Sequence, residues 1–518
     1  ARRFDRRRAH HRSHVGKCRQ SRDSIRRVIP RLSRARDDFG RMSSDVRDDE
    51  NYIGALVRAR ALETLDAHAR DASSSSSSYT AFAAFVVVER DARERDEGPR
   101  VRVASWATGT KCVAKRRRGT RGDVVGDCHA ETLARRAFRR WLCEEYESAR
   151  DGKPSVFVEV DREGSGAEDD GGAVLVKMRS GVEVHAYCSQ SPCGDASVFA
   201  APAERDGSIG GGREEASAIA GGERLKRAKT MGSMGGGAGT TGAKIFDGAT
   251  AGGGGGADSE REAATQEVGA IRWKPGRGDP SFCLSCSDKL CRWGMEGVEG
   301  KLLRHVVLEP VRLTSVCVSA PRVAEESRAE TRRVVRAALE RAIARRVREG
   351  VGEDAPPAPR CVVVDPHDRV GLSSYASVVA GDRAASPLSL VATGPSTATR
   401  SSTTHHPPTV ERVLGAKGYR HGCSKSSVDA GAAASEHAPS RYARAFARAV
   451  LSRASPACRA RFAAMSYREA KSRAPRAARA AFDANPVARR LFAPLPGKSA
   501  AALDAGDFHP FTDASSTA

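Results

Sequence analysis

The sequence predicts an α/β fold, in which helices cover a mixed β-sheet and a helical region follows at the C-terminal end. Three observations predict it. Apolar runs rich in β-branched and aromatic residues alternate with amphipathic stretches over the first part of the chain. From residue 440 onward only helical spacing recurs. The chain has 518 residues, enough for a large core, and no run approaches the roughly 18 apolar residues of a membrane span. We therefore expect a globular protein with no membrane partner.

The first part of the chain supplies the predicted sheet and its principal helices. Residues 51–70 have helical spacing, and a serine run ends that helix. Asp127 is the expected N-cap of a longer helix, since its carboxylate can accept the first free backbone N–H groups. One face of that helix is apolar and carries Leu133, Ala137, Phe138, Trp141 and Leu142. The predicted strands are residues 79–90 and 100–106, which form a hairpin, and residues 155–160 and 182–187.

Two stretches without sustained periodicity interrupt the remainder. Residues 201–270 hold 19 of the 50 glycines, and residues 380–440 are rich in Ser, Thr, Pro and Ala, so we expect both to be flexible insertions. The other predicted elements are a strand at 311–319, a helix at 331–348, a strand at 361–364 and helices near 442–452 and 467–482. The predicted organisation is a basic, disordered extension at 1–49 and one domain at 50–518.

The charge of the chain suits a partner that carries phosphates. The net charge is +22 and the pI is about 9.8. Residues 1–41 contain 15 Lys/Arg and 4 Asp/Glu, so half of the excess lies in the extension. That segment lacks the apolar core of a secretory signal, and both an organelle-targeting segment and a true start at Met42 remain open. Thirteen cysteines without a dense, regular spacing favour a reduced, intracellular setting, in the nucleus or the cytoplasm.

Three short motifs have the residues of one catalytic zinc site. They contain His129, Cys193 after a proline, and Cys286. One His and two Cys thiolates leave a fourth coordination position for water, which is typical of catalytic zinc. Glu131, two residues after the His, completes the His-x-Glu and Pro-Cys signature of the zinc nucleobase deaminases. The sequence therefore predicts that His129, Cys193 and Cys286 bind zinc and that Glu131 transfers protons.

The predicted chemistry is hydrolytic. Zinc brings the pKa of a water close to neutrality, and Glu131 takes the proton of that water and passes it to the purine ring and the departing amine. We expect Cys193 to begin a helix, whose N-terminal partial charge favours a thiolate. An alternative is a structural zinc site built on Cys283 and Cys286, although no second Cys-x-x-Cys or His pair completes it.

The wide separation of the two cysteines resembles the ADAR-type family of RNA adenosine deaminases. Compact deaminases place both in one Pro-Cys-x-x-Cys motif, whereas here Cys286 follows Cys193 after 93 positions. Further similar stretches are residues 108–112, 127–136 and 286–293, and the resemblance spans roughly residues 50–511. It implies a cytidine-deaminase-like three-layer core elaborated by the C-terminal helices. Gly126 departs from the family pattern, which has Asn there, and residues 507–511 match its closing segment only loosely.

Within that family the chain is most similar to the branch that acts on tRNA. Residues 241–244 and 274–279 resemble that branch, and the Gly-Glu-Gly loop of the double-stranded RNA editors is not found. The resemblance implies conversion to inosine of the adenosine 3′ of the anticodon in alanine tRNA, with no obligate protein partner. An editor of structured RNA and a catalytically inactive RNA-binding homologue remain alternatives, and the intact Glu131 argues against the second.

The resemblance also implies a buried inositol hexakisphosphate and a set of RNA contacts. The positions that match polyphosphate contacts of the family are Arg135, Arg136, Lys289, Arg292, Trp293, Arg444, Tyr467 and Lys471, with Lys244 from the tRNA branch. For RNA, Thr110 and Lys111 match a loop near the substrate, and Lys274 and Arg277 are expected to place charge beside the third ligand. For Arg135 and Arg136 the alternative is a solvated helix face, and for Lys274 and Arg277 it is an ordinary pair of surface cations.

Overall fold

A seven-stranded sheet forms the centre of the protein. The computed structural model describes residues 50–72, 78–90, 99–160, 172–199, 244–245, 268–274, 281, 283–349, 355–366, 384–400, 410–475, 486–492 and 508–511. The strands of the sheet are β2 (Phe82–Glu89), β3 (Arg100–Thr108), β8 (Val182–Cys188), β12 (Ser315–Ser319), β13 (Arg360–Val364), β15 (Leu388–Thr393) and β16 (Glu411–Leu414). Their order is β13–β12–β8–β2–β3–β15–β16. The strands β13, β12 and β8 are parallel to one another, and the other neighbouring pairs are antiparallel.

Both faces of the sheet are apolar because the central strand alternates its side chains between two cores. In β2, Phe82 and Val86 belong to the core on one face, whereas Phe85 and Val87 belong to the core on the other. Such a strand reads as a continuous apolar run, so its burial on both sides follows from its sequence.

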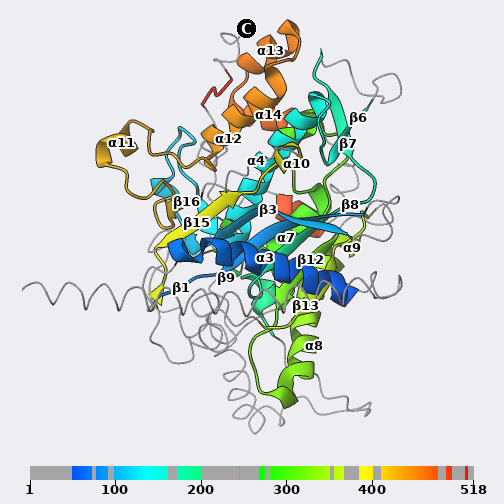
Figure 1. The fold of residues 1–518 in the computed structure, drawn as a ribbon. Helices are drawn as coiled ribbons and strands as arrows, with labels where there is room; N and C mark the ends of the chain where they lie inside the picture. The colour runs from blue at the N-terminus through cyan, green and yellow to red at the C-terminus, as the bar shows by residue number, and fades with distance from the viewer. Residues whose placement is uncertain are drawn as a thin grey trace, which may run out of the picture.

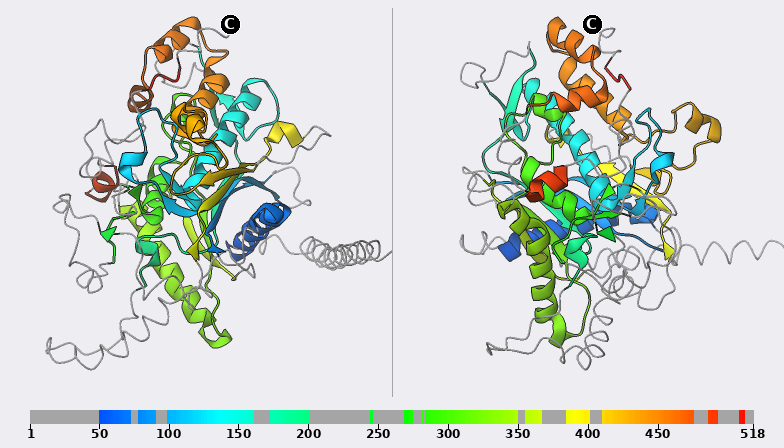
Figure 2. Two further views of the ribbon diagram at one scale, coloured as in Figure 1. Left: turned by 90° about the vertical axis from the view of Figure 1, so that its left-hand side faces the viewer. Right: turned by 180° about the vertical axis from the view of Figure 1, so that it is seen from behind.

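One long helix covers each face, which gives three layers (Figures 1 and 2). The helix α3 (Glu50–Ala72) packs Ile53 and Val57 against one face. The helix α4 (Ala130–Arg150) packs on the other, where Phe138 stacks on Phe85 with ring centroids 4.9 Å apart. This is the mixed sheet with helices on both sides that the sequence predicts, and the fold class is confirmed.

The remaining elements surround this core. Short strands pair as β1 (Ser78–Tyr79) with β14 (Ala384–Ala385), β4 (Thr110–Cys112) with β5 (Asp127–His129), β6 (Phe157–Val160) with β7 (Leu175–Met178), and β10 (Arg272–Lys274) with both β9 (Lys244–Ile245) and β11 (Cys283–Leu284). The helices include α7 (Cys286–Glu296), α8 (Arg328–Leu339), a π-helical segment η6 (Glu340–Arg345), α9 (Arg346–Glu349), α10 (Thr397–Arg400), α11 (Lys425–Asp429) and α16 (Pro486–Phe492). The short 3-10 helices are η1 (Lys115–Arg117), η3 (Asp195–Ser197), η4 (Leu303–His305) and η5 (Glu325–Ser327).

A helical region follows at the C-terminal end, drawn orange in Figure 1. It consists of α12 (Pro439–Phe446), the π-helical η9 (Ala447–Leu451), α13 (Pro456–Ala463) and α14 (Tyr467–Ser472). Phe446, Phe462 and Phe511 pack edge to face or tilted in its interior. Because α12 and η9 contact α4, this region extends the core of the sheet domain.

Several predicted boundaries differ from the structure. Asp127 is not the N-cap of α4, a position that His129 takes, because residues 127–129 pair with β4 as a strand. No α-helix begins at Cys193, which is followed only by η3. The strand predicted at 155–160 is present as β6 but pairs with β7 outside the main sheet.

The predicted insertion at 380–440 is wrong in its described part. The strands β15 and β16 lie there, and β15 pairs with β3 of the main sheet. Residues 1–49 and nearly all of 201–270 lie outside the described residues, so those two predictions stay as they are. Among the described helices, none has both the length and the apolar character that a membrane crossing requires.

Candidate active site

His129 and Glu131 lie where β5 ends and α4 begins. The pairing of Thr110 with His129 in the β4–β5 hairpin fixes the backbone just before the helix. Glu131 follows in the first turn of α4, where a carboxylate is favoured by the N-terminal partial charge of the helix. It is 6% exposed, and its Oε2 is buried without a hydrogen-bond partner among the described residues. A buried carboxylate oxygen without a partner is costly, which marks it as a group awaiting a ligand.

Asp127 orients the imidazole of His129. The Nδ1 of His129 donates to Oδ1 of Asp127 at 2.9 Å, and the backbone N–H of His129 donates to the same oxygen at 3.0 Å. This leaves Nε2 as the nitrogen that Asp127 does not bind, an arrangement typical of metal-binding histidines. Burial and the nearby Lys274 oppose the imidazolium, but the Asp127 carboxylate and a hydrogen bond with Cys193 outweigh them and raise the pKa of His129 to about 9.

Cys193 and Cys286 meet at the N-terminus of α7. Cys286 is the first residue of that helix, and its backbone N–H donates to Sγ of Cys193 at 3.4 Å. The hydrogen bond from the Cys286 thiol, followed by the positive charge of Lys274 and His129, holds the pKa of Cys193 well below its ordinary value despite burial. The prediction that Cys193 begins its own helix is wrong, and the helix N–H that reaches its sulfur belongs to α7.

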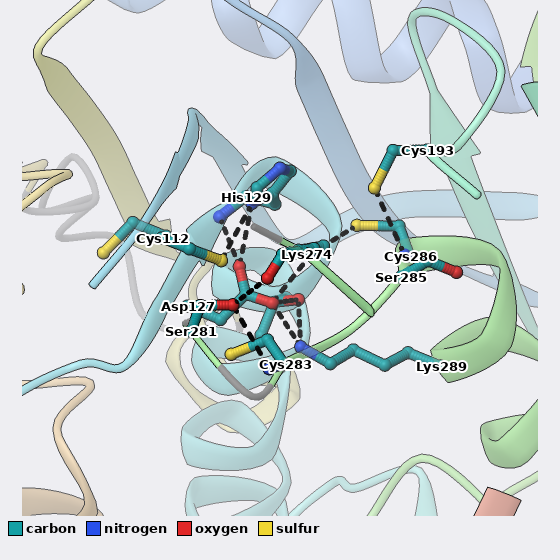
Figure 3. Close-up of polar contacts among 12 residues, drawn as sticks. Cys112, Asp127, His129, Cys193, Lys274, Ser281, Cys283, Ser285, Cys286 and Lys289 are labelled. Carbon is teal, nitrogen blue, oxygen red and sulfur yellow. Dashed lines mark hydrogen bonds and ion pairs between the residues drawn. The ribbon is translucent and has the colours of Figure 1, made fainter. Parts of the chain in front are cut away.

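Lys274 lies inside the site, between Asp127 and Cys286 (Figure 3). Its Nζ donates to Oδ2 of Asp127 at 2.8 Å and to Sγ of Cys286 at 3.0 Å, and its side chain is 3% exposed. The ammonium of Lys289 also donates to Oδ2 of Asp127. Burial alone would raise the pKa of Asp127, but these two ammonium groups hold it well below its usual range. Lys274 is therefore not an ordinary surface cation, the alternative to the predicted RNA contact, because the buried carboxylate of Asp127 and the thiol of Cys286 enclose it.

The structure brings the predicted metal ligands and Glu131 into one region. The backbone N–H of Cys286 donates to Cys193, His129 lowers the pKa of Cys193, and the charge of Glu131 raises the pKa of Cys286. The donor set of one imidazole and two thiols, with a free buried carboxylate beside it, fits a catalytic zinc ion.

Another cluster in the described part of the chain is more compact. One donor atom each from Cys112, Asp127 and His129 lies within 4.8 Å of the others, which the donors of the predicted trio do not all satisfy. However, Asp127 in this cluster already binds two ammonium groups, and the cluster uses the nitrogen of His129 that Asp127 holds. The cluster is consequently explained by hydrogen bonding without a metal ion.

The other predicted RNA contacts are only partly described. Thr110 and Lys111 are half-buried on β4, beside the strand that carries His129. Arg277 and its neighbours from 275 to 280 lie outside the described residues.

Most of the predicted polyphosphate contacts gather beside α4 and α7. The guanidinium of Arg135 lies over the Trp293 ring, 4.7 Å from its centroid, and Nε of Arg136 is buried without a partner among the described residues. Burial and the neighbouring Arg139 lower the pKa of Arg135 to about 9. Buried cations that lack full compensation fit a polyanion.

Cations from other elements extend this group. Burial, with Arg292 and Lys471 nearby, lowers the pKa of Lys301, which the sequence analysis did not single out. Lys471 lies over the Tyr467 ring at 4.9 Å. The Arg444 side chain, by contrast, is exposed on α12, so the structure does not bring it into the group.

Sequence reasoning missed the residues that support the predicted ligands. Asp127 was interpreted only as a helix cap, and Cys112 was noted only within a motif. Asp195 and Asp288 each follow a predicted ligand by two positions and are fully buried. The sequence did contain a pattern that could have identified them, namely an aspartate two positions after each of the two cysteines.

His129 and Glu131 lie at the start of a helix that packs on a mixed sheet, and Cys193 and Cys286 come from segments far apart in the chain, an arrangement typical of the nucleobase deaminases. Residues 105–484 match the profile of the Adenosine-deaminase (editase) domain. This is well over half of the chain, and the chain belongs to that family.

Relatives fall into two groups by their names. A "tRNA-specific adenosine deaminase 1" of Drosophila melanogaster is 30% identical over 214 residues, 41% of this chain and 43% of that protein. The protein of that name from Homo sapiens is 28% identical over 281 residues, 42% of this chain and 54% of that protein. The "Double-stranded RNA-specific editase Adar" of Drosophila melanogaster is 28% identical over 222 residues, 42% of this chain and 27% of that protein. The chain thus matches about half the length of the tRNA-specific relatives.

Proposed function

We propose that this protein deaminates adenosine to inosine in RNA by zinc-dependent hydrolysis. The observation that carries the proposal is the buried Oε2 of Glu131, which has no hydrogen-bond partner among the described residues and acts on the thiol of Cys286, in an editase-family domain. A binding protein would gain nothing from a buried carboxylate without a partner, whereas proton transfer requires one.

His129, Cys193 and Cys286 would hold the zinc ion. When bound, zinc supplies an activated water at neutral pH. Asp127 keeps the proton of His129 on Nδ1, so that Nε2 can act as a ligand. Lys274 donates to Cys286, which lowers the negative charge that two thiolates would otherwise concentrate.

Glu131 would do the proton transfer. Its position in the first turn of α4 holds the carboxylate beside the proposed ligands, and its burial excludes bulk water. It would carry one proton from the attacking water to the adenine ring and a second from the newly formed hydroxyl to the amine, which leaves as ammonia when the C–N bond breaks. Hydrolysis is then complete without a redox cofactor.

The proposed substrate is tRNA, and within it the adenosine 3′ of the anticodon of alanine tRNA. Relatives named for tRNA support the first part, and the resemblance at residues 241–244 and 274–279 supports the second. An anticodon-loop base is already unpaired, so its extrusion costs less than flipping from a duplex. We also propose an inositol hexakisphosphate among the buried cations of α4, α7 and α14, since Arg135 and Arg136 lack full compensation there.

Inosine formation by the purified protein on unmodified alanine tRNA tests the proposal, with a long RNA duplex alongside. Glu131→Gln keeps the shape of the side chain and should lower activity by at least about a hundredfold, the usual contribution of a general acid–base group. Glu147→Gln, on the same helix but away from the site, is the matched control and should keep full activity.

The outcomes separate the candidates. Inosine beside the anticodon that disappears in Glu131→Gln supports the proposal. Inosine in the duplex would place the protein among the structured-RNA editors. The chain is also similar to such an editase, the one from Drosophila melanogaster. No inosine on either RNA, from protein that contains zinc, would favour an RNA-binding role.

A further inference from the structure

Two buried carboxylates lie close behind the proposed cysteine ligands. Asp195 follows Cys193 by two positions, and Asp288 follows Cys286 by two, and both are 0% exposed. Their segments come from parts of the chain 93 positions apart. Whatever joins the two carboxylates therefore also fixes the two cysteines relative to each other.

Arg346 joins them directly. One branch of its guanidinium, Nη1, donates to Oδ1 of Asp288 at 2.7 Å, and the other, Nη2, donates to Oδ2 of Asp195 at 3.3 Å. Its side chain is 6% exposed. A planar guanidinium with donors in a fixed fork can hold two acceptors at a defined separation, which an ammonium cannot.

Further groups satisfy the carboxylates from other sides. The backbone N–H of Arg272 donates to Asp288 at 2.8 Å, and that of Gly269 donates to Asp195 at 2.8 Å. Arg341 donates to the Asp195 carboxylate at 3.2 Å and to its carbonyl oxygen at 2.9 Å. The cluster is thus fully hydrogen-bonded, the condition under which buried charges stabilise one arrangement.

The π-helical segment η6 explains how two arginines reach the same carboxylate. Arg341 and Arg346 are five positions apart, and in a regular α-helix such residues lie roughly 140° apart around the axis. In a π-helix the hydrogen bonds run from i to i+5, so residues five apart lie nearly above one another. The segment covers residues Glu340–Arg345, and both side chains contact Asp195.

We propose that Arg346 is a positioning residue of the metal site, which sets the geometry of Cys193 and Cys286 by clamping Asp195 and Asp288. In this role it acts through Asp195 in η3 and Asp288 in α7, without itself contacting substrate or metal. The inference rests on the proposed function, because it requires that the two cysteines bind zinc.

Arg346→Lys tests the clamp, because lysine keeps the charge but cannot hold both carboxylates. Arg345→Lys is the matched control, because Arg345 is the adjacent residue and its side chain is 64% exposed. Two measurements are made on each full-length variant: the rate at which zinc passes to a chromogenic chelator, and the visible absorption of the cobalt-substituted protein. Arg346→Lys should release zinc at least about tenfold faster, as expected for loss of a group that orients metal ligands, and its cobalt bands should shift. Arg345→Lys should match the wild type in both.

Asp288→Asn removes the Arg346–Asp288 ion pair by changing the acid, and it replaces Arg346→Lys in the test if that variant does not fold. Adding Arg346→Lys to Asp288→Asn should accelerate zinc release less than it does in the wild type, because the contact is already lost. A lowered melting temperature with unchanged cobalt bands and zinc release would overturn the inference and leave Arg346 a purely structural residue. A wild-type protein that binds neither zinc nor cobalt would overturn the proposed function, and this inference with it.

Discussion

Asp127 accepts hydrogen bonds from a histidine and two lysines, and this makes it the most connected side chain of the candidate site. One oxygen orients His129, and the other binds Lys274 and Lys289. The acid therefore links a proposed metal ligand, through Lys274, to the thiol of Cys286. Removing one partner from such a buried pair leaves an uncompensated charge, which is more damaging than loss of a surface pair.

Lys274→Met should consequently lower the stability of the protein without changing the salt dependence of RNA binding. We expect a loss of about 3–5 kcal/mol in the free energy of unfolding, the range for breaking a buried ion pair from one side. The slope of the logarithm of the binding constant against that of the salt concentration should stay the same, because a lysine enclosed by Asp127 and Cys286 releases no counterion from RNA.

Lys111→Met is the comparison for this prediction. If Lys111 contacts a phosphate, as the family resemblance implies, the slope should fall by about 0.7–0.9 in this variant. Urea unfolding and fluorescence anisotropy at several salt concentrations measure the two quantities. A lower slope for Lys274→Met would restore the view that this lysine reaches RNA.

The residues that sequence reasoning identified were those that sit in local motifs. His129 with Glu131, Cys193 after its proline, and Cys286 could each be recognised from their immediate neighbours. The roles of Lys274 and Arg346 could not, because their partners lie 147 and 151 positions away in Asp127 and Asp195. A lysine that is buried and one that is exposed have the same local sequence signal.

At the level of elements, strong apolar periodicity was sufficient to predict a helix, whereas amino-acid composition gave a wrong prediction for a strand. The helix after Asp127 was predicted from its apolar face, and the five residues named for that face are all buried in α4. The strand β15 was missed because Ser, Thr and Pro surround it and only six residues form it. Its place next to β3 is set by pairing between segments far apart in the chain, which cannot be predicted from a short stretch of sequence.

The packing of α4 against the segment before α12 gives the protein an acid-sensitive contact. Arg136 donates to the carbonyl oxygen of His437, and that side chain is buried. Burial, with Arg140 and Arg136 nearby, lowers the pKa of His437 to about 3. Glu411 lies 3.8 Å from its Nε2 but is a weak counter-ion, because burial raises the pKa of that carboxyl.

This contact predicts a loss of stability as the pH falls from about 6.5 towards 3. In that range the unfolded chain protonates the histidine and the folded protein does not, so acid favours unfolding by up to roughly 1.4 kcal/mol for each pH unit. His437→Asn carries no titrating group, and its stability relative to the wild type should rise as the pH is lowered through this range.

Unfolding by urea at several pH values between 7.5 and 4.5 measures the difference. His421→Asn, which alters an exposed histidine, is the control and should parallel the wild type. A constant difference between the wild type and His437→Asn over this range would mean that His437 titrates normally in the folded protein.

Across the whole molecule, partly buried cations accumulate where the sheet domain meets the C-terminal helices. Arg135, Arg292 and Lys471 belong to three helices, α4, α7 and α14, that are far apart in sequence. Like charges at this junction repel one another, which disfavours the contact between the two regions. A bound polyanion would reverse that effect and join them.

We therefore expect the purified protein to carry a polyphosphate that is visible by native mass spectrometry. Arg136→Met should lower its occupancy and the melting temperature together, since Nε of this arginine is buried without a partner in the described part of the chain. Arg444→Met should change neither, because that side chain is exposed on α12. Fully active protein without bound polyphosphate would contradict the prediction.

The contact between Cys193 and Cys286 has a consequence for how this protein tolerates the insertion of residues between them. Their contact closes a loop of 93 positions, for which polymer theory gives an entropic cost of about 4 kcal/mol plus a constant. That cost rises only with the logarithm of loop length, so doubling the loop would add about 0.6 kcal/mol. Apart from residues of this interval that contact the site, such as Arg272 and Lys274, the chain between the two ends can therefore lengthen at little entropic cost. This interval is thus a permissive place for evolution to insert residues.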